Sequence, residues 1–174
     1  MSRLKNSRPR DGAQTQDMRE GVVYPSYGRR PAPPAEVPAE FAGDYSEACA
    51  IVDLSPQASA ALSRRLLQAL LRGPGGIPRK RDLHEEIEEA IGRGMRSDLA
   101  DQLHLVRVVG NFAAHPMKDR DTGMLLPVEP EEAEHLLELV ALLFDHYFVG
   151  PARTGAVKAA MNAKLAAAGK PPLP

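Results

Sequence analysis

The chain has 174 residues, the size of one domain, and its 43 % apolar and 26 % charged residues are typical of a globular protein. Its aromatic content of 5 %, with no Trp, provides few platforms for stacking single-stranded bases, and the net charge of −1 gives no overall attraction to nucleic acid or membranes. A single Cys excludes a disulfide framework and a zinc site built mainly of thiolates, and no export signal or long apolar run is present. We therefore expect a cytoplasmic protein with one core, no membrane segment, no metal and no cofactor.

The first 40 residues are rich in proline and basic side chains. Up to Arg30 they hold seven bases against three acids, and their prolines are Pro9, Pro25, Pro31, Pro33, Pro34 and Pro38. Such a segment buries too little apolar surface to offset the loss of chain entropy. We expect residues 1–40 to form a flexible or extended arm, either a solubilising leader or a tail that contacts phosphates or acidic partners.

Helical periodicity begins at Phe41. The apolar face of the first expected helix consists of Phe41, Tyr45, Ala48, Cys49 and Val52. Ser55 followed by Pro56 is typical of a capped helix start, and the pattern predicts a second helix that runs to about Arg72. Its inward residues are expected to be Ala58, Leu62, Leu66, Ala69 and Leu70.

Two further helices are expected between residue 73 and about residue 114. Residues 73–78 are rich in Gly and Pro and predict a loop. The stripe of a third helix consists of Leu83, Ile87, Ala90 and Ile91. This helix ends at Gly92 or Gly94, and Ser97 with the acids after it predicts a fourth helix that runs to about Ala114.

The last part of the chain predicts two more helices. After an irregular stretch, Pro130 and the acids around it begin a fifth helix, and Gly150–Pro151 ends it. Its apolar face consists of Leu136, Leu137, Val140, Leu143, Phe144 and Tyr147. Thr154 then caps a short helix through Ala168 that packs back or swaps onto a partner. One side of this helix carries Val157, Ala160, Met161 and Leu165.

These patterns together predict the fold class. We find no strand pattern, so we expect an all-α protein. Residues 1–40 are the arm, residues 41–150 form a bundle of four to five helices, and residues 151–174 form the C-terminal helix and tail.

Charge is segregated along the expected helices. Between Leu54 and Arg81 the bases occur without any acid, and they are Arg64, Arg65, Arg72, Arg79, Lys80 and Arg81. Between Pro127 and Phe148 the acids occur without any Lys or Arg, and they are Glu129, Glu131, Glu132, Glu134, Glu138 and Asp145. The two segments pair within one molecule, pair between two molecules, or form separate solvated faces, since an exposed ion pair contributes about 1 kcal/mol or less. The basic segment is the candidate surface for nucleic acid or a partner protein.

The fourth expected helix carries a polar stripe on an otherwise apolar surface. At about 100° per residue, its polar members share an arc of about 80°. They are His104, Arg107, Asn111 and His115. A helix that is apolar on its other sides belongs at the centre of a bundle or in an interface, where each unpaired polar group would cost about 1–3 kcal/mol. Gly110 in its interior indicates close approach of another helix.

Two interpretations of this stripe stay open. In the structural one, Asn111 and His115 form hydrogen bonds with a loop or a neighbouring helix, and Arg107 pairs with Glu132 or Glu134. In the functional one, the stripes of two protomers meet on a symmetry axis and hold a phosphate. There His115 transfers a proton and Arg107 stabilises the phosphoryl charge.

A family resemblance rests on the same residues. Ser55–Pro56 with its Ala-rich helix, the string Gly110-Asn111-x-x-Ala114-His115-Pro116 and the acidic start of the fifth helix resemble the domain of unknown function family numbered 4145. The resemblance covers roughly residues 41–149. That family is similar to a branch of the HEPN superfamily of helical bundles, found in bacterial proteins that include defence systems. The resemblance therefore implies a HEPN-like bundle that forms dimers.

The resemblance also implies a chemistry to compare with the stripe. Active HEPN ribonucleases cut RNA without a metal. They carry an Arg that is followed, after about four to six intervening residues, by a His. Here Gly110 stands at that Arg position, and seven residues separate Arg107 from His115. Arg107 lies on the same helix face as His115, so its long side chain still reaches toward a phosphate held there.

Three functional hypotheses follow. The first is a non-catalytic HEPN-like module that associates with itself, as a homodimer, or with a partner protein, in a context of defence or RNA. The second is a metal-independent ribonuclease with His115 as general acid and base, Arg107 as phosphate clamp and Asn111 as orienting residue. The third is a regulatory subunit that binds a nucleotide or nucleic acid through the basic segment.

Two other patterns are weaker. Glu132-x-x-His135 and Asp101-x-x-His104 imitate the spacing of a dinuclear metal site, but such a site needs further inward carboxylates. The third helix turns at least most of its glutamates outward. Cys49 lies on an apolar helix face, so we expect it in the core rather than as a nucleophile.

Overall fold

A computed structural model describes residues 30–109 and 128–173, and all regular structure within these ranges is helical. The elements are α1 (Ala39–Ile51), α2 (Pro56–Arg72), α3 (Leu83–Gly92), α4 (Ser97–Val109), α6 (Pro130–Phe144), the π-helical turn η1 (Asp145–Val149) and α7 (Gly150–Ala167). The predicted all-α class is therefore confirmed.

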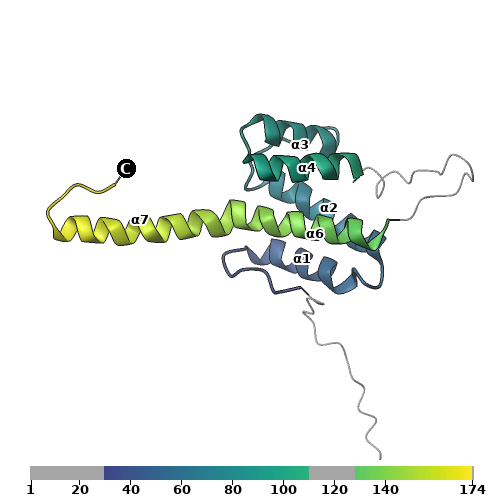
Figure 1. The fold of residues 1–174 in the computed structure, drawn as a ribbon, viewed down its shortest axis with the longest axis horizontal. Helices are drawn as coiled ribbons and strands as arrows, with labels where there is room; N and C mark the ends of the chain where they lie inside the picture. Colours follow the sequence, from purple (N-terminus) through teal and green to yellow (C-terminus); the bar gives the residue numbers. More distant parts are fainter. Residues whose placement is uncertain (1–29, 110–127, 174) are drawn as a thin grey trace, which may run out of the picture.

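Helices α2 and α6 form the centre of the bundle. α1 packs against both of them, α4 packs on α6, and α3 contacts α2 and α4. In Figure 1, α1 lies on one side of α6, and α3 and α4 lie on the other. The largest fully buried apolar side chains are Leu66, Leu67, Leu70, Leu71, Ile87, Leu99, Leu103, Leu137, Leu139, Leu143 and Phe144. Most of them come from α2 and α6, so the core lies where these two helices face each other.

The local signals for helix starts are confirmed at the second and fifth expected helices. The backbone N–H of Ala58 donates to the Ser55 Oγ at 3.3 Å, and Pro56 occupies the first turn of α2. At the start of α6, the Glu129 N–H donates to the Glu132 side chain at 3.0 Å. These bonds satisfy amide groups that have no partner within the helix.

The inward face of α1 agrees with its prediction, whereas the face of α2 is rotated. Tyr45, Ala48 and Cys49 are buried in α1. In α2 the predicted Leu66 and Leu70 are buried, together with Ser59, Ala60, Ser63, Leu67 and Leu71, whereas Ala58 is exposed. The Ser59 hydroxyl donates to the Ala48 carbonyl at 2.8 Å. Small residues on this side of α2 let α1 approach closely, which turns that side inward.

The predicted end of the fifth helix at Gly150–Pro151 is wrong. The chain stays helical from Pro130 to Ala167, and the Gly150 N–H donates to the Asp145 carbonyl in a widened π turn. A proline removes one backbone hydrogen bond and crowds the preceding turn. The wider turn of η1 absorbs this change, so Pro151 lies in the first turn of α7 instead of ending the helix.

Helix α7 projects from the bundle. It continues the line of α6 well beyond the other helices in Figure 1, and none of its residues is buried. It begins at Gly150, four residues before the predicted cap at Thr154. The chain reverses after it, because Gly169 has a φ of +68° and the Lys170 N–H donates to the Leu165 carbonyl at 2.9 Å.

The last part of the predicted arm contacts the bundle. Residues 30–38 precede α1, and Val37 among them is buried in the core. The Arg30 side chain donates to Glu134 of α6 at 2.8 Å through Nε. Residues 1–29 lie outside the described residues.

Candidate functional site

The described part of α4 carries the start of the predicted polar stripe. The core face of α4 consists of Leu99, Leu103 and Val106, whereas His104 is exposed and Leu105 is 51 % exposed. The described part of this helix therefore lies at the edge of the bundle and not at its centre, and the alternative that its outer side belongs to an interface stays a prediction. Among the described helices, α4 packs on α3 and α6, and His104 and Leu105 lie on its opposite side.

The other members of the stripe belong to the end of α4 or lie outside the described residues. Arg107 belongs to the last turns of α4, which ends at Val109. Asn111 and His115, like Gly110, lie outside the described residues. The structural and catalytic interpretations of the stripe both stay predictions.

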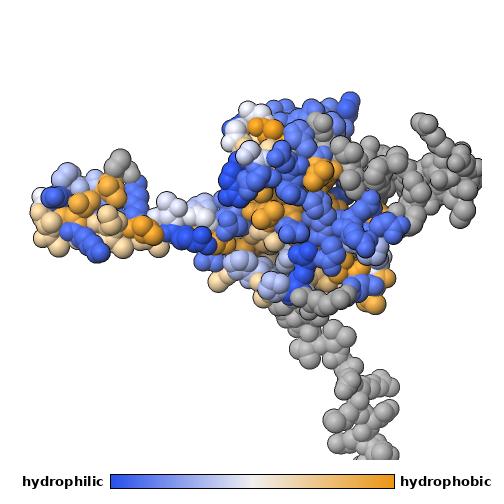
Figure 2. Space-filling view, viewed as in Figure 1, coloured by the Kyte–Doolittle hydropathy of each residue, from blue (hydrophilic) through white to orange (hydrophobic). Residues whose placement is uncertain are grey.

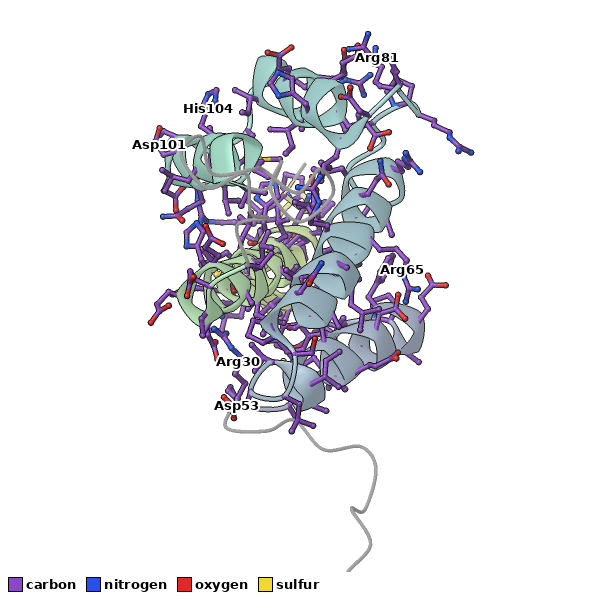
Figure 3. All side chains as sticks on the ribbon, turned by 90° about the vertical axis from the view of Figure 1, so that its right-hand side faces the viewer. Arg30, Asp53, Arg65, Arg81, Asp101 and His104 are labelled. Atoms are coloured by element: carbon purple, nitrogen blue, oxygen red, sulfur yellow. The ribbon has the colours of Figure 1, made fainter. Side chains whose placement is uncertain are left out.

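The basic residues of the segment 64–81 do not form one surface. Arg65 extends from the middle of α2, whereas Arg81 lies before α3 at the far end of the bundle in Figure 3. Arg65 pairs with Asp44 of α1 at 3.3 Å, and Lys80 pairs with Glu89 at 3.4 Å. Arg81 pairs with Asp82 and Glu85, and Arg72 pairs with Glu86. Four of the six bases therefore have acidic partners, which lie on α1, at the N-cap of α3 or within α3. Burial lowers the pKa of Arg64, and Arg79 is exposed.

The carboxylate of one of these pairs, Arg72 with Glu86, is buried. Glu86 of α3 is 0 % exposed, and its Oε1 accepts from Arg72 Nε at 2.9 Å and from Arg72 Nη2 at 2.7 Å. The Lys80 backbone N–H donates to the same oxygen at 3.0 Å. The pair thus ties the end of α2 to α3 and to the loop between them.

Electrostatics keep this carboxyl charged. Burial acts to raise the pKa of Glu86, but the hydrogen bonds from the Arg72 side chain and the Lys80 N–H act against it. With a smaller contribution from the Gln68 side chain, they hold the pKa of Glu86 below its ordinary value.

Sequence reasoning missed Glu86, although a signal was present. Leu83, Glu86, Ile87 and Ala90 are all buried in α3 and follow the i, i+3, i+4, i+7 spacing of one helix face. The statement that most glutamates of this helix turn outward therefore needs an exception at Glu86. Its position within the apolar stripe predicts a buried carboxylate, which needs a basic partner.

A second polar cluster lies between α1, α6 and the segment before α1. Arg30 donates to Glu134 and lies near Tyr45, which in turn lies near Cys49. Burial raises the pKa of Tyr45 to about 12 and also raises the pKa of the Cys49 thiol. Cys49 is 2 % exposed and stays a thiol at neutral pH, so the prediction that it belongs to the core is confirmed.

The acidic residues of α6 follow its solvent-facing side. Glu131 and Glu138 are exposed, and Asp145 at the start of η1 has a side chain 48 % exposed. Their spacing places them on one strip of the helix, together with the half-buried Ala141 and Leu142. The strip runs along the side of the central helix that the bundle leaves uncovered.

The projecting helix carries an exposed apolar strip. Val157 is 61 % exposed and Met161 is 45 % exposed, and Leu173 in the C-terminal tail is 42 % exposed. The tail runs back along α7, because the Leu173 N–H donates to the Asn162 side chain at 2.7 Å. A shallow groove of about 530 Å³ lies there, lined by Arg153, Thr154, Val157, Lys158, Met161 and Leu173.

Figure 2 shows where apolar surface reaches solvent on one side of the molecule. The tip formed by α7 and the tail carries a group of apolar residues, and the narrow region where α7 leaves the bundle is mixed. Large apolar residues exposed elsewhere in the described ranges are Leu54 and Leu105. These two are separated from each other in the chain and the fold, whereas those of α7 and the tail lie together.

Metal-ligand spacing on α4 does not correspond to a cluster. Asp101 and His104 point away from the bundle in Figure 3. Within residues 30–109 and 128–173, no group of three or more His, Cys, Asp or Glu side chains is placed to hold a metal ion. None of the helices in these ranges combines the length and apolar character needed to cross a bilayer.

Comparison with known proteins places the chain in a family. Searches of curated proteins and of solved structures gave no significant match. The model of a family described as a domain of unknown function, DUF4145, matches residues 46–164. This range begins within α1 and includes most of α7, so the projecting helix is part of the matched region. Because the match covers more than half of the 174 residues, the chain belongs to the DUF4145 family.

Proposed function

We propose that this protein is a non-catalytic association module with a HEPN-like bundle, acting in the cytoplasm, and that α7 is the element that contacts its partner. The observation that carries the proposal is the projection of α7 from the bundle with none of its 18 residues buried. A helix that serves only its own fold normally buries one face. Here the bundle covers no face of α7, so the helix is available to another surface.

The side chains of α7 suit a docking helix. Val157 and Met161 lie on one side with the tail residue Leu173, so the exposed apolar groups are adjacent rather than scattered. Adjacent apolar groups left in water favour association, since burial of each gains free energy. Alanines flank this strip and let a partner backbone approach closely.

Site-specific photo-crosslinking tests this function. A photoreactive amino acid replaces Met161 on the apolar side of α7 in the full-length protein, expressed in its native cells. The matched control places it at Ala159, on the opposite side of the same helix. We expect a discrete covalent adduct from position 161 and none from position 159. No adduct at position 161, or equal adducts at both positions, would contradict the proposal.

The ribonuclease hypothesis is a separate prediction with its own test. It depends on Arg107, Asn111 and His115, of which the last two lie outside the described residues. It requires that the purified protein cut RNA in the presence of a metal chelator and that His115→Ala abolish cleavage while the helical circular dichroism is kept. Cleavage that survives His115→Ala would exclude His115 as the catalytic acid and base.

The third hypothesis, binding of a nucleotide or nucleic acid through the basic segment, predicts binding that weakens steeply with salt. The ion pairs of Arg65 and Arg72 with acids of α1 and α3 reduce the charge that this segment offers. We therefore prefer association through α7.

A further inference from the structure

We propose that the partner of α7 is a second copy of this chain, and that α7 of each copy lies antiparallel along the acidic strip of α6 in the other. This inference rests on the proposed function, because it names the surface that the docking helix meets. The rod formed by α6, η1 and α7 supplies both halves of the contact. The twofold axis of this arrangement passes between the two rods at the level of η1.

Charge complementarity is the first argument. From Gly150 to the end of the sequence the chain holds four bases and no acid, and the bases are Arg153, Lys158, Lys164 and Lys170. From Glu129 to Asp145 it holds six acids and no Lys or Arg. Two α7 helices that packed on each other would bring like charges together. An α7 helix on α6 of a second copy brings opposite charges together instead.

The two strips lie on the same side of the rod. Arg153 Nη2 in the first turn of α7 is 4.0 Å from Asp145 Oδ1 in η1. Asp145 continues the exposed strip of α6, and Arg153 lines the groove with Val157 and Met161. A single face of the rod is therefore acidic along α6 and basic and apolar along α7. A twofold contact needs this arrangement, because both halves must face the partner at once.

The spacing of the charges limits the register to two neighbouring alternatives, centred on residue 148 or on residue 149. When two rods run antiparallel, residues equally distant from the axis along the two chains lie opposite each other. Lys158 and Glu138 are equally distant from residue 148, and Lys164 and Glu134 from residue 149, both within η1. Glu131 lies one turn further along α6 and also comes within reach of Lys164.

The register centred on residue 149 also pairs apolar groups. Val157 and Ala141 are also equally distant from residue 149, so Val157 meets the half-buried Ala141 and Leu142 of the second copy. These two residues interrupt the acids of the α6 strip at the point where α7 is apolar. Twofold symmetry makes the whole contact twice, once for each α7. With 18 residues, each α7 contributes a contact about 27 Å long.

Charge exchange tests the pairing in the purified full-length chain. Sedimentation or light scattering gives the mass in solution, and we expect twice the mass of one chain. The double variant Lys158→Glu with Lys164→Glu is expected to be a monomer, and so is Glu131→Lys with Glu138→Lys. The chain that carries all four substitutions regains opposite charges and is expected to dimerise again. Arg79→Glu, at an exposed position in the loop before α3 and outside the rod, is the control and keeps the dimer.

Disulfide trapping tests the register. Val157 and Ala141 of one chain are 16 residues apart on the rod, about 24 Å, so cysteines at these positions cannot join within a molecule. Two copies of Val157→Cys are equally far apart across the axis. We expect neither single variant alone to form a disulfide-linked dimer, whereas a mixture of Val157→Cys and Ala141→Cys forms one under mild oxidation.

The outcomes separate this inference from the function on which it rests. A monomeric protein that still gives a position-161 adduct with a different protein overturns the twofold pairing and leaves the association function intact. A dimer that survives both charge reversals, or crosslinking of Val157→Cys with itself, shows that copies meet in another way and overturns the register. A monomer without any adduct at position 161 overturns both proposals.

Discussion

The two halves of the long rod, α6 and α7, share one continuous helix and have opposite surroundings. In α6, Leu137, Leu143 and Phe144 are essentially inaccessible to water, whereas in α7 every residue retains exposure. Packing against α1, α2 and α4 stabilises α6. Continuity with α6 and the high helix propensity of its alanines support α7. The comparison teaches that helix formation alone does not tell which part of a rod builds the fold and which part is left for a partner.

The largest expected difference between the halves concerns apolar truncation. Leu137→Ala in α6 leaves a cavity in the core and is expected to lower the free energy of unfolding by about 2–5 kcal/mol. Met161→Ala in α7 removes a side chain that is already 45 % exposed, and we expect a change within about 0.5 kcal/mol for the monomer. Chemical denaturation of both variants, followed at a concentration low enough to exclude association, measures the two values. Equal losses would show that α7 is part of the cooperative core.

The next effect concerns the buried carboxylate on the bundle side. Arg72→Met removes the guanidinium that holds Glu86 while it keeps much of the apolar side chain. Since Glu86 is 0 % exposed and Arg72 is 31 % exposed, we expect a loss of about 2–3 kcal/mol at neutral pH, below the range for a fully buried pair. Arg81→Met is the control, because that side chain is 79 % exposed and its pairs lie on the surface. Thermal denaturation of both variants compares them, and equal losses would contradict a special role of the buried pair.

The pH dependence of stability is a second measurement of the interaction between Arg72 and Glu86. The pKa of Glu86 is lower in the folded chain than its ordinary value near 4.5, so its contribution to stability is present above that value. The contribution is lost as the pH falls through the lower folded pKa. In Arg72→Met, burial is left with less opposition and raises the pKa of Glu86. The stability gap between wild type and Arg72→Met should therefore begin to narrow above pH 4.5, where the carboxyl of the variant takes up a proton, and continue to narrow as the pH falls through the lower folded pKa of the wild type. A gap that is constant with pH would show that Arg72 acts through packing.

Sequence patterns predicted where individual helices begin better than they predicted how one helix continues into the next. Ser55 with Pro56 predicted the start of α2 because capping and the fixed φ of proline are local effects. The same reasoning failed at Gly150–Pro151. Whether a proline ends a helix depends on the geometry of the turn before it, which the local sequence does not specify. The widened turn of η1 accepted Pro151, and no periodicity in the sequence distinguishes that solution from a helix end.

The candidate site shows a similar division. The basic and acidic segments were evident from the sequence, yet their pairing was not. Arg72 pairs with an acid of α3, and Arg65 pairs with an acid of α1. These partners depend on how the helices pack and not on the net charge of a sequence segment. The sequence also did not predict that Val157 and Met161 are exposed. An apolar strip at helical spacing normally predicts burial, and only the direction of the rod after η1 shows that the bundle leaves it uncovered.

A glycine in the bundle is expected to resist substitution. A Cβ at Gly75 would lie 2.5 Å from the Leu71 carbonyl oxygen and 2.7 Å from the Tyr147 hydroxyl, at the junction of α2 with η1. The first neighbour is backbone and cannot move without distorting the end of α2. Gly75→Ala is therefore expected to cost about 1–3 kcal/mol in unfolding free energy. Thermal melting measures it, and an unchanged midpoint would mean that the end of α2 yields easily.

The same substitution in α7 should have a small effect of the opposite sign. Gly155 lies inside the helix, and a Cβ there meets nothing within 4 Å. Gly155→Ala therefore adds no clash and removes the entropic cost of glycine, which is worth about 0.5–1 kcal/mol in a helix interior. Within the described residues, no helix of the bundle packs on α7, so the added stability of α7 is not passed to the bundle. We therefore expect slower amide hydrogen exchange in α7 alone, with exchange in α2 and α6 unchanged. Faster exchange in α7 would show that Gly155 is needed for its geometry. Slower exchange that also extended into α6 would show that the two halves of the rod unfold as one unit, and the contrast between them would then be one of exposure only.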